Sequence, residues 1–334
     1  MIRRALRTFV WALAWLIAFG CAGWAFGALH YDFPVARTVV GLLFAAAIVA
    51  AIVFLRGYVR KLGAVFFAFA LILAWWLTLK PSNDGNWQPD VAQLAWADTN
   101  GDEFTFHNVR NCDYRTGTDY TPHWETRTVR LSQITGIDLA IDYWGSPWIA
   151  HPIVSFQFAD VPPLCFSIET RKTFGQSYST IGGLYRQYTL IYLVSDERDV
   201  IRLRTNYRHE DIYLYHLTIA PARARERFLE YVRSLNALRT QPRWYNAITT
   251  NCTTSIRSQH PSSERIPWDW RILLNGKGDE LLYEDGALVT GGLPFAKLRH
   301  RSLIDDRAKA ADASPDFSKL IRVGLPAPEP RVAQ

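Results

Sequence analysis

The chain has 334 residues, of which 49% are hydrophobic and 14% aromatic, a composition typical of packed proteins and unlike that of disordered ones. Its net charge of +6 comes from the N-terminus: residues 1–80 carry eight Lys and Arg and one acidic residue, which leaves 29 basic and 30 acidic residues in the remainder. The near-neutral balance beyond residue 80 argues against a nucleic-acid-binding surface.

Residues 8–29, 38–55 and 62–79 form three apolar stretches without a charged side chain. At about 1.5 Å rise per residue, each is long enough as a helix to cross a hydrocarbon core of about 30 Å. The first stretch follows a basic start and could be a signal peptide, but the two further stretches argue against a cleaved leader. The sequence therefore predicts three membrane-spanning helices.

Basic residues indicate how these spans are oriented. They cluster before the first span and between the second and third: Arg3, Arg4, Arg7, Arg56, Arg60 and Lys61. Because short cytoplasmic loops are enriched in Lys and Arg, the N-terminus is expected in the cytoplasm and everything after Lys80 in the periplasm of a bacterium. Trp75 and Trp76 are then expected at the outer interface of the inner membrane.

The remaining 250 or so residues predict an α+β domain with an antiparallel sheet and flanking helices. A helix is expected to begin at Pro221, with Phe228, Tyr231 and Leu235 on one face. The acidic run 196–199 is expected to be a solvated hairpin turn, and the Ala-rich run 308–315 a surface linker. Runs rich in β-branched and aromatic residues predict strands over 104–109, 128–131, 151–158, 164–169, 188–194, 200–205 and 212–218.

The predicted organisation is therefore a membrane domain over residues 1–80, a linker and domain entry over 81–103, a periplasmic domain over 104–326 and a loose tail over 327–334.

Cys252 has the most informative local setting in the outer domain. Asn251 is expected to cap a short helix that runs from Cys252 towards Ser258. A thiol at a helix N-terminus has its thiolate stabilised by the macrodipole and the unpaired backbone N–H groups, which can also serve as an oxyanion hole. A nucleophilic cysteine therefore suits this position, whereas a buried structural cysteine gains nothing from it.

The other outer cysteines, Cys112 and Cys165, leave two alternatives. If one disulfide forms, pairing these two would leave Cys252 free; otherwise all three are small buried residues. No pair of cysteines has the short spacing of a zinc site, and neither a metal nor a cofactor is expected.

A cysteine nucleophile needs a base, and among eight histidines His151 is the candidate because it begins a predicted strand that would hold its ring rigidly. Glu169 lies on the next predicted strand, on the face of Ser167 and opposite the aliphatic face, where it could orient the imidazole. The alternative is that His151 is a surface or capping residue of the strand.

Several separated motifs strengthen this hypothesis: residues 151–156 (HPIVSF), 167–171 (SIETR), 192–199 (YLVSDERD), 202–204 (RLR), 244–246 (WYN) and 251–254 (NCTT). In this order, these motifs resemble the Lnb N-terminal periplasmic domain family. The resemblance extends from about residue 104 to residue 326. That family is similar to the permuted branch of NlpC-type, papain-like cysteine enzymes, in which the histidine strand precedes the nucleophile.

The resemblance implies a Cys252, His151 and Glu169 catalytic set that moves an acyl chain from a phospholipid, through a cysteine thioester, to an amine such as a lipoprotein N-terminus. Two alternatives share the fold: a cell-wall peptidase or amidase acting on a wall peptide, and an inactive module that only binds a lipoprotein or a wall peptide. The membrane spans favour a lipid substrate.

Five residues are expected to bind substrate. Three arginines could hold a phosphate headgroup, with Arg202 and Arg204 on one face of the predicted strand 200–205, or could instead pair with acidic side chains in a structural network. The five are Arg171, Arg202, Arg204, Tyr245 and Asn251.

Overall fold

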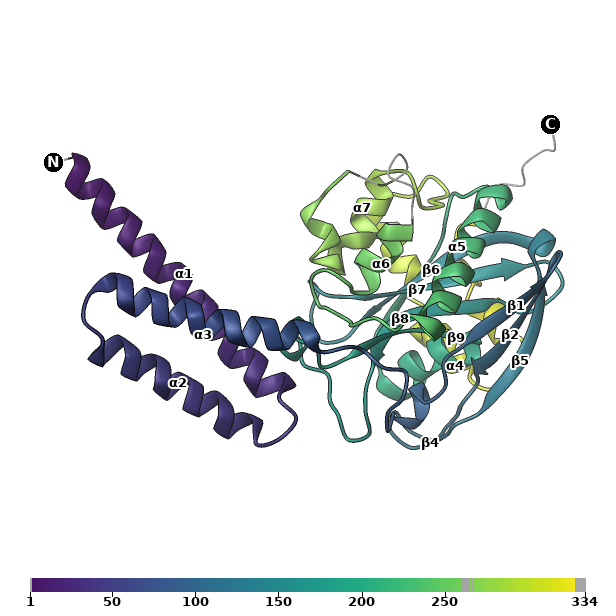
Figure 1. Cartoon of the computed structure of the whole chain (residues 1–334). Helices are drawn as coiled ribbons and strands as arrows, with labels where there is room; N and C mark the ends of the chain where they lie inside the picture. The colour runs from purple at the N-terminus through teal and green to yellow at the C-terminus, as the bar shows by residue number, and fades with distance from the viewer. Residues whose placement is uncertain (1, 260–264, 266, 328–334) are drawn as a thin grey trace. The chain divides into compact units, whose positions relative to one another are not determined.

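Figure 1 shows the computed structural model, which describes residues 2–259, 265 and 267–327. The chain divides into two compact units. The first unit comprises residues 1–82, 178–189 and 244–247, and the second comprises 83–177, 190–243 and 248–334.

Three long apolar helices dominate the first unit: α1 (Ile2–Asp32), α2 (Arg37–Phe54) and α3 (Tyr58–Thr78). Each is long and apolar enough to cross a membrane, as the sequence predicts. Ala18, Ile48 and Val65 are buried where the helices pack together. Asp32 accepts hydrogen bonds from the indole of Trp76 (2.7 Å) and from the backbone N–H of Arg186 (3.1 Å), which fastens residues 178–189 to the ends of α1 and α3.

An eight-stranded sheet organises the second unit, in the order β1-β2-β9-β8-β7-β6-β10 with β5 paired to β2. The strands are β1 (Trp96–Asn100), β2 (Glu103–Arg110), β5 (Trp124–Arg130), β6 (Ile134–Tyr143), β7 (His151–Phe158), β8 (Leu164–Arg171), β9 (Thr189–Ser195) and β10 (Asp211–His216). A short separate hairpin joins β3 (Asp113–Tyr114) and β4 (Tyr120–Thr121). The α+β class is confirmed, but the sheet is mixed, because β2 and β9 pair in parallel through Arg110 and Ser195.

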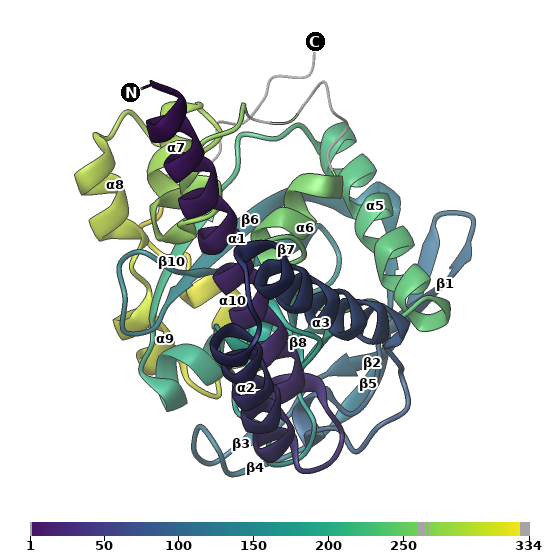
Figure 2. The ribbon, with the colours of Figure 1, turned by 60° about the vertical axis from the view of Figure 1, so that its left-hand side comes forward.

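Helices cover both faces of this sheet. One face packs on α5 (Pro221–Thr240) and α6 (Cys252–Gln259), which lie side by side in both views of Figures 1 and 2. The predicted apolar face of α5 is confirmed: Phe228 is buried against Phe156 and Phe166. The other face packs on α4 (Glu197–Arg202), α9 (Asp305–Ala311) and α10 (Phe317–Leu320), around Val200, Ile304 and Phe317. Two further helices are α7 (Gly278–Glu284) and α8 (Phe295–Ser302).

Two sequence predictions about residues 196–205 are wrong. Asp196 caps α4 by accepting a hydrogen bond from the backbone N–H of Arg198 (2.8 Å), so the segment is a helix, continued by a π-helical turn over Leu203–Arg208. The acidic run is not solvated, since Glu197 and Asp199 are completely buried. Both carboxylates are neutralised by arginines distant in sequence, which the local pattern could not reveal.

Two other expectations are settled. The Ala-rich run is not a surface linker, because Ala308 and Ala311 lie in the core beneath the sheet. Cys112 and Cys165 are free thiols in separate buried clusters, so they form no disulfide. Residues 328–334 of the predicted tail lie outside the described residues.

Candidate active site

Cys252 is the first residue of α6, where the sequence places it. Asn251 caps this helix: its Oδ1 accepts the backbone N–H of Thr254 (2.9 Å), and its carbonyl accepts that of Ser255 (2.9 Å). Asn251 therefore acts through the helix end, whatever else it contacts during a reaction. The backbone N–H groups of Cys252 and Thr253 interact with the Cys252 thiol, and N–H groups at a helix start can serve as an oxyanion hole.

Asn275 holds the start of α6 against the start of β7. Its Nδ2 donates to the carbonyl of Ala150 (2.6 Å) and to Thr253 Oγ1 (2.8 Å), and it lies 3.9 Å from Cys252 Sγ. Its Oδ1 accepts the backbone N–H of Ala150 (2.9 Å). Ala150, the residue before His151, is thus held beside Cys252 by two hydrogen bonds to Asn275. Asn275 was not predicted, since nothing in its local sequence distinguishes it from a turn asparagine.

His151, Ser167 and Glu169 form a hydrogen-bonded relay on one face of β7 and β8. Ser167 Oγ donates to Glu169 Oε1 (2.6 Å), so it must accept the proton of His151 Nε2, 2.7 Å away. His151 Nε2 itself is 3.8 Å from Glu169 Oε1. This pattern assigns the neutral imidazole its proton on Nε2, which leaves the lone pair of Nδ1 free to accept another.

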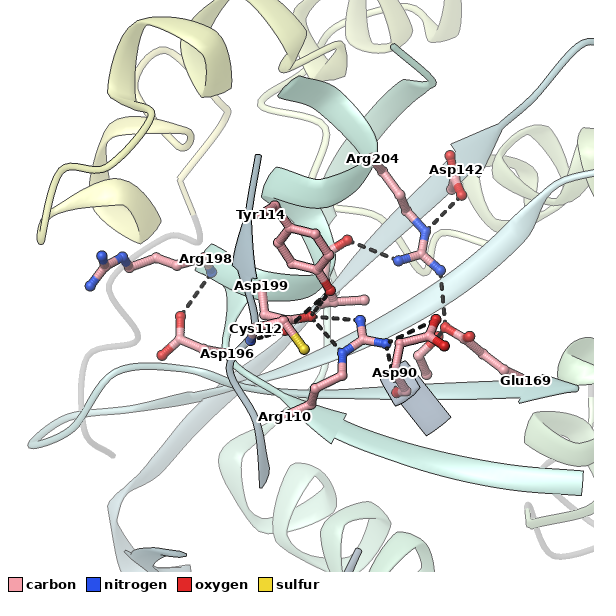
Figure 3. A network of polar contacts seen from close by, with 12 residues as sticks. Asp90, Arg110, Cys112, Tyr114, Asp142, Glu169, Asp196, Arg198, Asp199 and Arg204 are labelled. Atoms are coloured by element: carbon pink, nitrogen blue, oxygen red, sulfur yellow. Dashed lines mark hydrogen bonds and ion pairs between the residues drawn. The ribbon is translucent and has the colours of Figure 1, made fainter. Parts of the chain in front are cut away.

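Arg204 fixes the carboxylate of this relay (Figure 3). Its Nη2 donates to Glu169 Oε1 (3.0 Å) and its Nε to Asp142 Oδ2 (2.8 Å), and its side chain is almost completely buried. Burial alone would raise the pKa of Glu169, but the charge of Arg204, together with His151, Arg110 and the hydrogen bond from Ser167, more than offsets it and holds that pKa well below its usual range. Glu169 is therefore a carboxylate at all moderate pH values.

The start of α6 and the imidazole lie at the same end of β7, but the body of α6 packs on the face of the sheet opposite to that of His151. His151 shares its face with Ser155, which bonds to Glu197 of α4 (2.5 Å), whereas the next residue, Pro152, shares a cavity with Thr253 of α6. No hydrogen bond joins Cys252 to His151 in the described structure. Asn275 Nδ2, which lies 3.9 Å from Cys252 Sγ, also donates to the carbonyl of Ala150, the residue before His151.

Burial sets the resting protonation states of both groups. It raises the pKa of Cys252 to about 11, although hydrogen bonding to Thr253 opposes the shift. It also lowers the pKa of His151 to about 4, an effect reinforced by the positive charge of Arg204. At neutral pH the pair is a thiol beside a neutral imidazole. The predicted thiolate is therefore not the resting form, because desolvation outweighs the helix terminus.

Alkylation should reveal this protonation state. Only the thiolate reacts with iodoacetamide, so the rate at Cys252 is expected to be low at pH 7 and to rise about tenfold per pH unit towards pH 11. The rate is read by mass spectrometry of the peptide containing Cys252, with the peptide of buried Cys165 as an internal comparison. A rate already on a plateau at pH 7 would show that Cys252 rests as a thiolate.

An apolar cavity of about 240 Å³ adjoins the cysteine. Thr253 and Asn275 form part of its wall, so it reaches the residue next to Cys252. Most of the remaining wall is aliphatic and comes from β6, β7 and α7; it includes Leu139, Ile141, Val154, Leu281 and Leu282. A long hydrocarbon chain suits such a wall better than a polar peptide does.

The other predicted binding residues have protein partners. Arg171 donates to the carbonyls of Val91 (2.9 Å) and Ala92 (2.6 Å), and it stacks on Trp87 at 4.3 Å. Arg202 bonds to Asp312 (2.9 Å). The pairing of Arg202 with Asp312 and of Arg204 with Glu169 corresponds to the structural-network alternative, whereas Arg171 contacts backbone carbonyls and an indole and, among the described residues, no acidic side chain.

The structure does not place Arg202 and Arg204 on a strand face, because they lie on α4 and in the π-helical turn. Tyr245 belongs to the first unit, where its backbone N–H donates to the carbonyl of Tyr188 (2.9 Å). Within the described residues no group of three or more His, Cys, Asp or Glu side chains could hold a metal ion.

Comparison with known proteins gives one match. A family model, the Lnb N-terminal periplasmic domain, matches residues 120–276, which contain His151, Ser167, Glu169, Cys252 and Asn275. No curated protein and no solved structure matches the chain.

Proposed function

Because residues 120–276 of this chain belong to the Lnb N-terminal periplasmic domain family, we propose that it transfers an acyl chain from a phospholipid through a thioester on Cys252. The three candidate spans and this family make the chain an inner-membrane protein with a periplasmic domain. The N-terminus is assigned to the cytoplasm by the basic residues around the spans.

One observation supports acyl transfer above the alternatives: the cavity beside Cys252 is lined mainly by aliphatic side chains. The wall also contains Arg227, Arg257, Arg265 and Arg271. A cell-wall peptide would nevertheless place amide groups against the aliphatic part of the wall, where each unpaired polar group would cost about 1–3 kcal/mol. An acyl chain instead gains free energy from every methylene that leaves water.

The first chemical step forms the thioester. As Cys252 Sγ attacks the ester carbonyl, His151 Nδ1 takes the thiol proton, and the N–H groups at the start of α6 stabilise the oxyanion. The C–O bond of the ester then breaks, and the leaving alcohol receives the proton from His151. Ser167 and Glu169 hold the imidazole and stabilise its transient positive charge.

The second step returns the enzyme to its starting state. An amine attacks the thioester carbonyl and gives up a proton, the new amide leaves, and Cys252 recovers its thiol. Both steps need the thiol and imidazole in contact, although no hydrogen bond joins them in the described structure. Catalytic hydrogen bonds of this kind often form only when substrate is bound, and the start of β7 is where a small displacement would close the gap.

A thioester adduct tests this proposal. The full chain in phospholipid nanodiscs carrying a radiolabelled acyl chain is expected to acquire label that hydroxylamine removes at neutral pH. Cys252→Ala should acquire none, while Cys165→Ala, which removes another buried thiol, should label like the wild type. An unlabelled wild-type chain, or label that persists in Cys252→Ala, would exclude acyl transfer through this residue.

A further inference from the structure

The second unit exposes a tight group of tryptophans near the candidate active site. Among the described residues, the four exposed tryptophans all lie on two loops, 144–149 and 268–274, and are 43–64% exposed. Ile149, Leu273 and Leu274 on the same loops are also exposed. We call these seven residues the tryptophan patch; its tryptophans are Trp144, Trp148, Trp268 and Trp270.

The two loops are fastened into one surface. The rings of Trp148 and Trp270 lie 6.4 Å apart, and the backbone N–H of Gly276 donates to the carbonyl of Trp148 (3.0 Å). Gly276 is packed so closely here that an added Cβ would lie 2.4 Å from the carbonyl oxygen of Pro147. The patch is therefore preformed, because the close backbone contact between Gly276 and residues 147–148 fixes the two loops that carry its exposed rings.

Two cations lie over rings of the patch. The guanidinium of Arg257 is 5.7 Å from the ring centre of Trp268, and the ammonium of Lys277 is 6.0 Å from that of Trp148. Tryptophan with an adjacent cation is the combination enriched where proteins meet the headgroup region of a bilayer. The ring reaches the acyl boundary, and the cation stays near the phosphates.

The patch is continuous with the apolar cavity. Residues 270–278 supply patch residues Trp270, Leu273 and Leu274 and also cavity residues, among them Ile272 and Asn275. On the other loop, the ring of Trp144 lies 6.5 Å from that of His151. A surface held by the patch would therefore lie beside the cavity and the candidate catalytic residues.

We propose that the tryptophan patch docks on the headgroup region of the phospholipid bilayer, so that an acyl chain can enter the cavity without crossing water. The acyl part of this statement rests on the proposed function, but the docking does not. The bilayer is favoured over a protein partner because only residues 79–82 connect α3 to the second unit, which keeps a membrane within reach. It is also favoured by the cations, which complement lipid phosphates.

Photocrosslinking distinguishes the possible occupants. The full chain carries p-benzoylphenylalanine at Trp148 or Trp270, in the Cys252→Ala background, in nanodiscs containing radiolabelled phospholipid. Illumination is expected to attach lipid to the protein at both positions. The matched control is Val323, which is 63% exposed on the second unit away from these two loops. Lipid labelling no greater than at Val323, or crosslinks only between two protein chains, would overturn the docking.

A kinetic comparison separates docking from chemistry. Trp148→Ser combined with Trp270→Ser is expected to slow acylation by phospholipid in nanodiscs by about tenfold, since the buried apolar area that sustains interfacial binding is lost. Acylation by a water-soluble short-chain thioester should be unchanged. Equal bilayer rates for the double variant and the wild type would refute the docking. A wild-type chain that forms no adduct with either donor would refute the proposed function, while the crosslinking result would still stand.

Discussion

Replacing Asp199 with alanine is expected to lower the free energy of unfolding of the second unit by about 3–5 kcal/mol, because it leaves a buried arginine without its counter-ion. Asp199 Oδ1 accepts hydrogen bonds from Arg110 Nε (2.9 Å) and Nη2 (2.6 Å), and Oδ2 accepts the backbone N–H of Cys112 (2.7 Å) (Figure 3). Both charged side chains are completely buried, so water cannot replace the lost carboxylate. The pair joins β2 to α4.

Thermal unfolding of the full chain in detergent, followed by near-UV circular dichroism, measures this effect. Asp312→Ala is the matched control: its aspartate pairs with Arg202 but is 53% exposed, so its removal is expected to cost no more than about 1 kcal/mol. Arg110→Met combined with Asp199→Leu should recover part of the lost stability, since no charge then remains buried. An unfolding midpoint for Asp199→Ala equal to that of Asp312→Ala would mean that the pair contributes little.

The same ion pair explains why α4 was predicted as a strand. Val200, Ile201 and Leu203 have the residue types of a strand, and their helical state depends on the Asp196 cap and on buried carboxylates at Glu197 and Asp199. Those carboxylates are tolerated because Arg322 and Arg110 reach them from 125 and 89 residues away. A local sequence pattern cannot identify arginine partners so far away in the chain.

Elements whose determinants are local were predicted well. β7 runs over His151–Phe158, as its apolar and β-branched pattern indicates, and α6 begins at Cys252 because Asn251 caps it. β6 was missed, although it lies between β7 and β10. Its Asp138 and Asp142 resemble turn residues, and their partners from other elements, Arg322 and His216 for Asp138 and Arg204 for Asp142, make them compatible with a buried strand.

The candidate site likewise has some residues that local sequence predicts and others that it does not. The pairing of His151 with Glu169 was predictable, because adjacent strands place them on one face, and Ser167 lies on that face two residues before Glu169. Asn275 and the aliphatic cavity were not predictable, since they depend on how residues 270–282 fold back over β6 and β7. The packing of α6 on the face of the sheet opposite to His151 also follows only from the assembled sheet.

The proposed chemistry depends on the transfer of the Cys252 thiol proton to His151. His151→Ala is expected to slow acylation of Cys252 by a water-soluble thioester by about 10²–10⁴-fold, the usual contribution of a general base. The rate is read as hydroxylamine-sensitive label on the full chain in detergent. The matched control is His107→Ala, which removes a histidine of β2 that pairs with Asp98 of β1. This variant should react like the wild type.

The pH dependence separates a base from a merely structural histidine. Because burial lowers the pKa of His151 to about 4, the imidazole is neutral above that value, and the acid limb of the acylation rate is expected near pH 4. The Glu169 carboxylate raises this pKa, so Glu169→Gln should shift the limb to lower pH as well as reduce the rate. If His151→Ala acylates as fast as the wild type, His151 is not the base, and another group must accept the proton of Cys252.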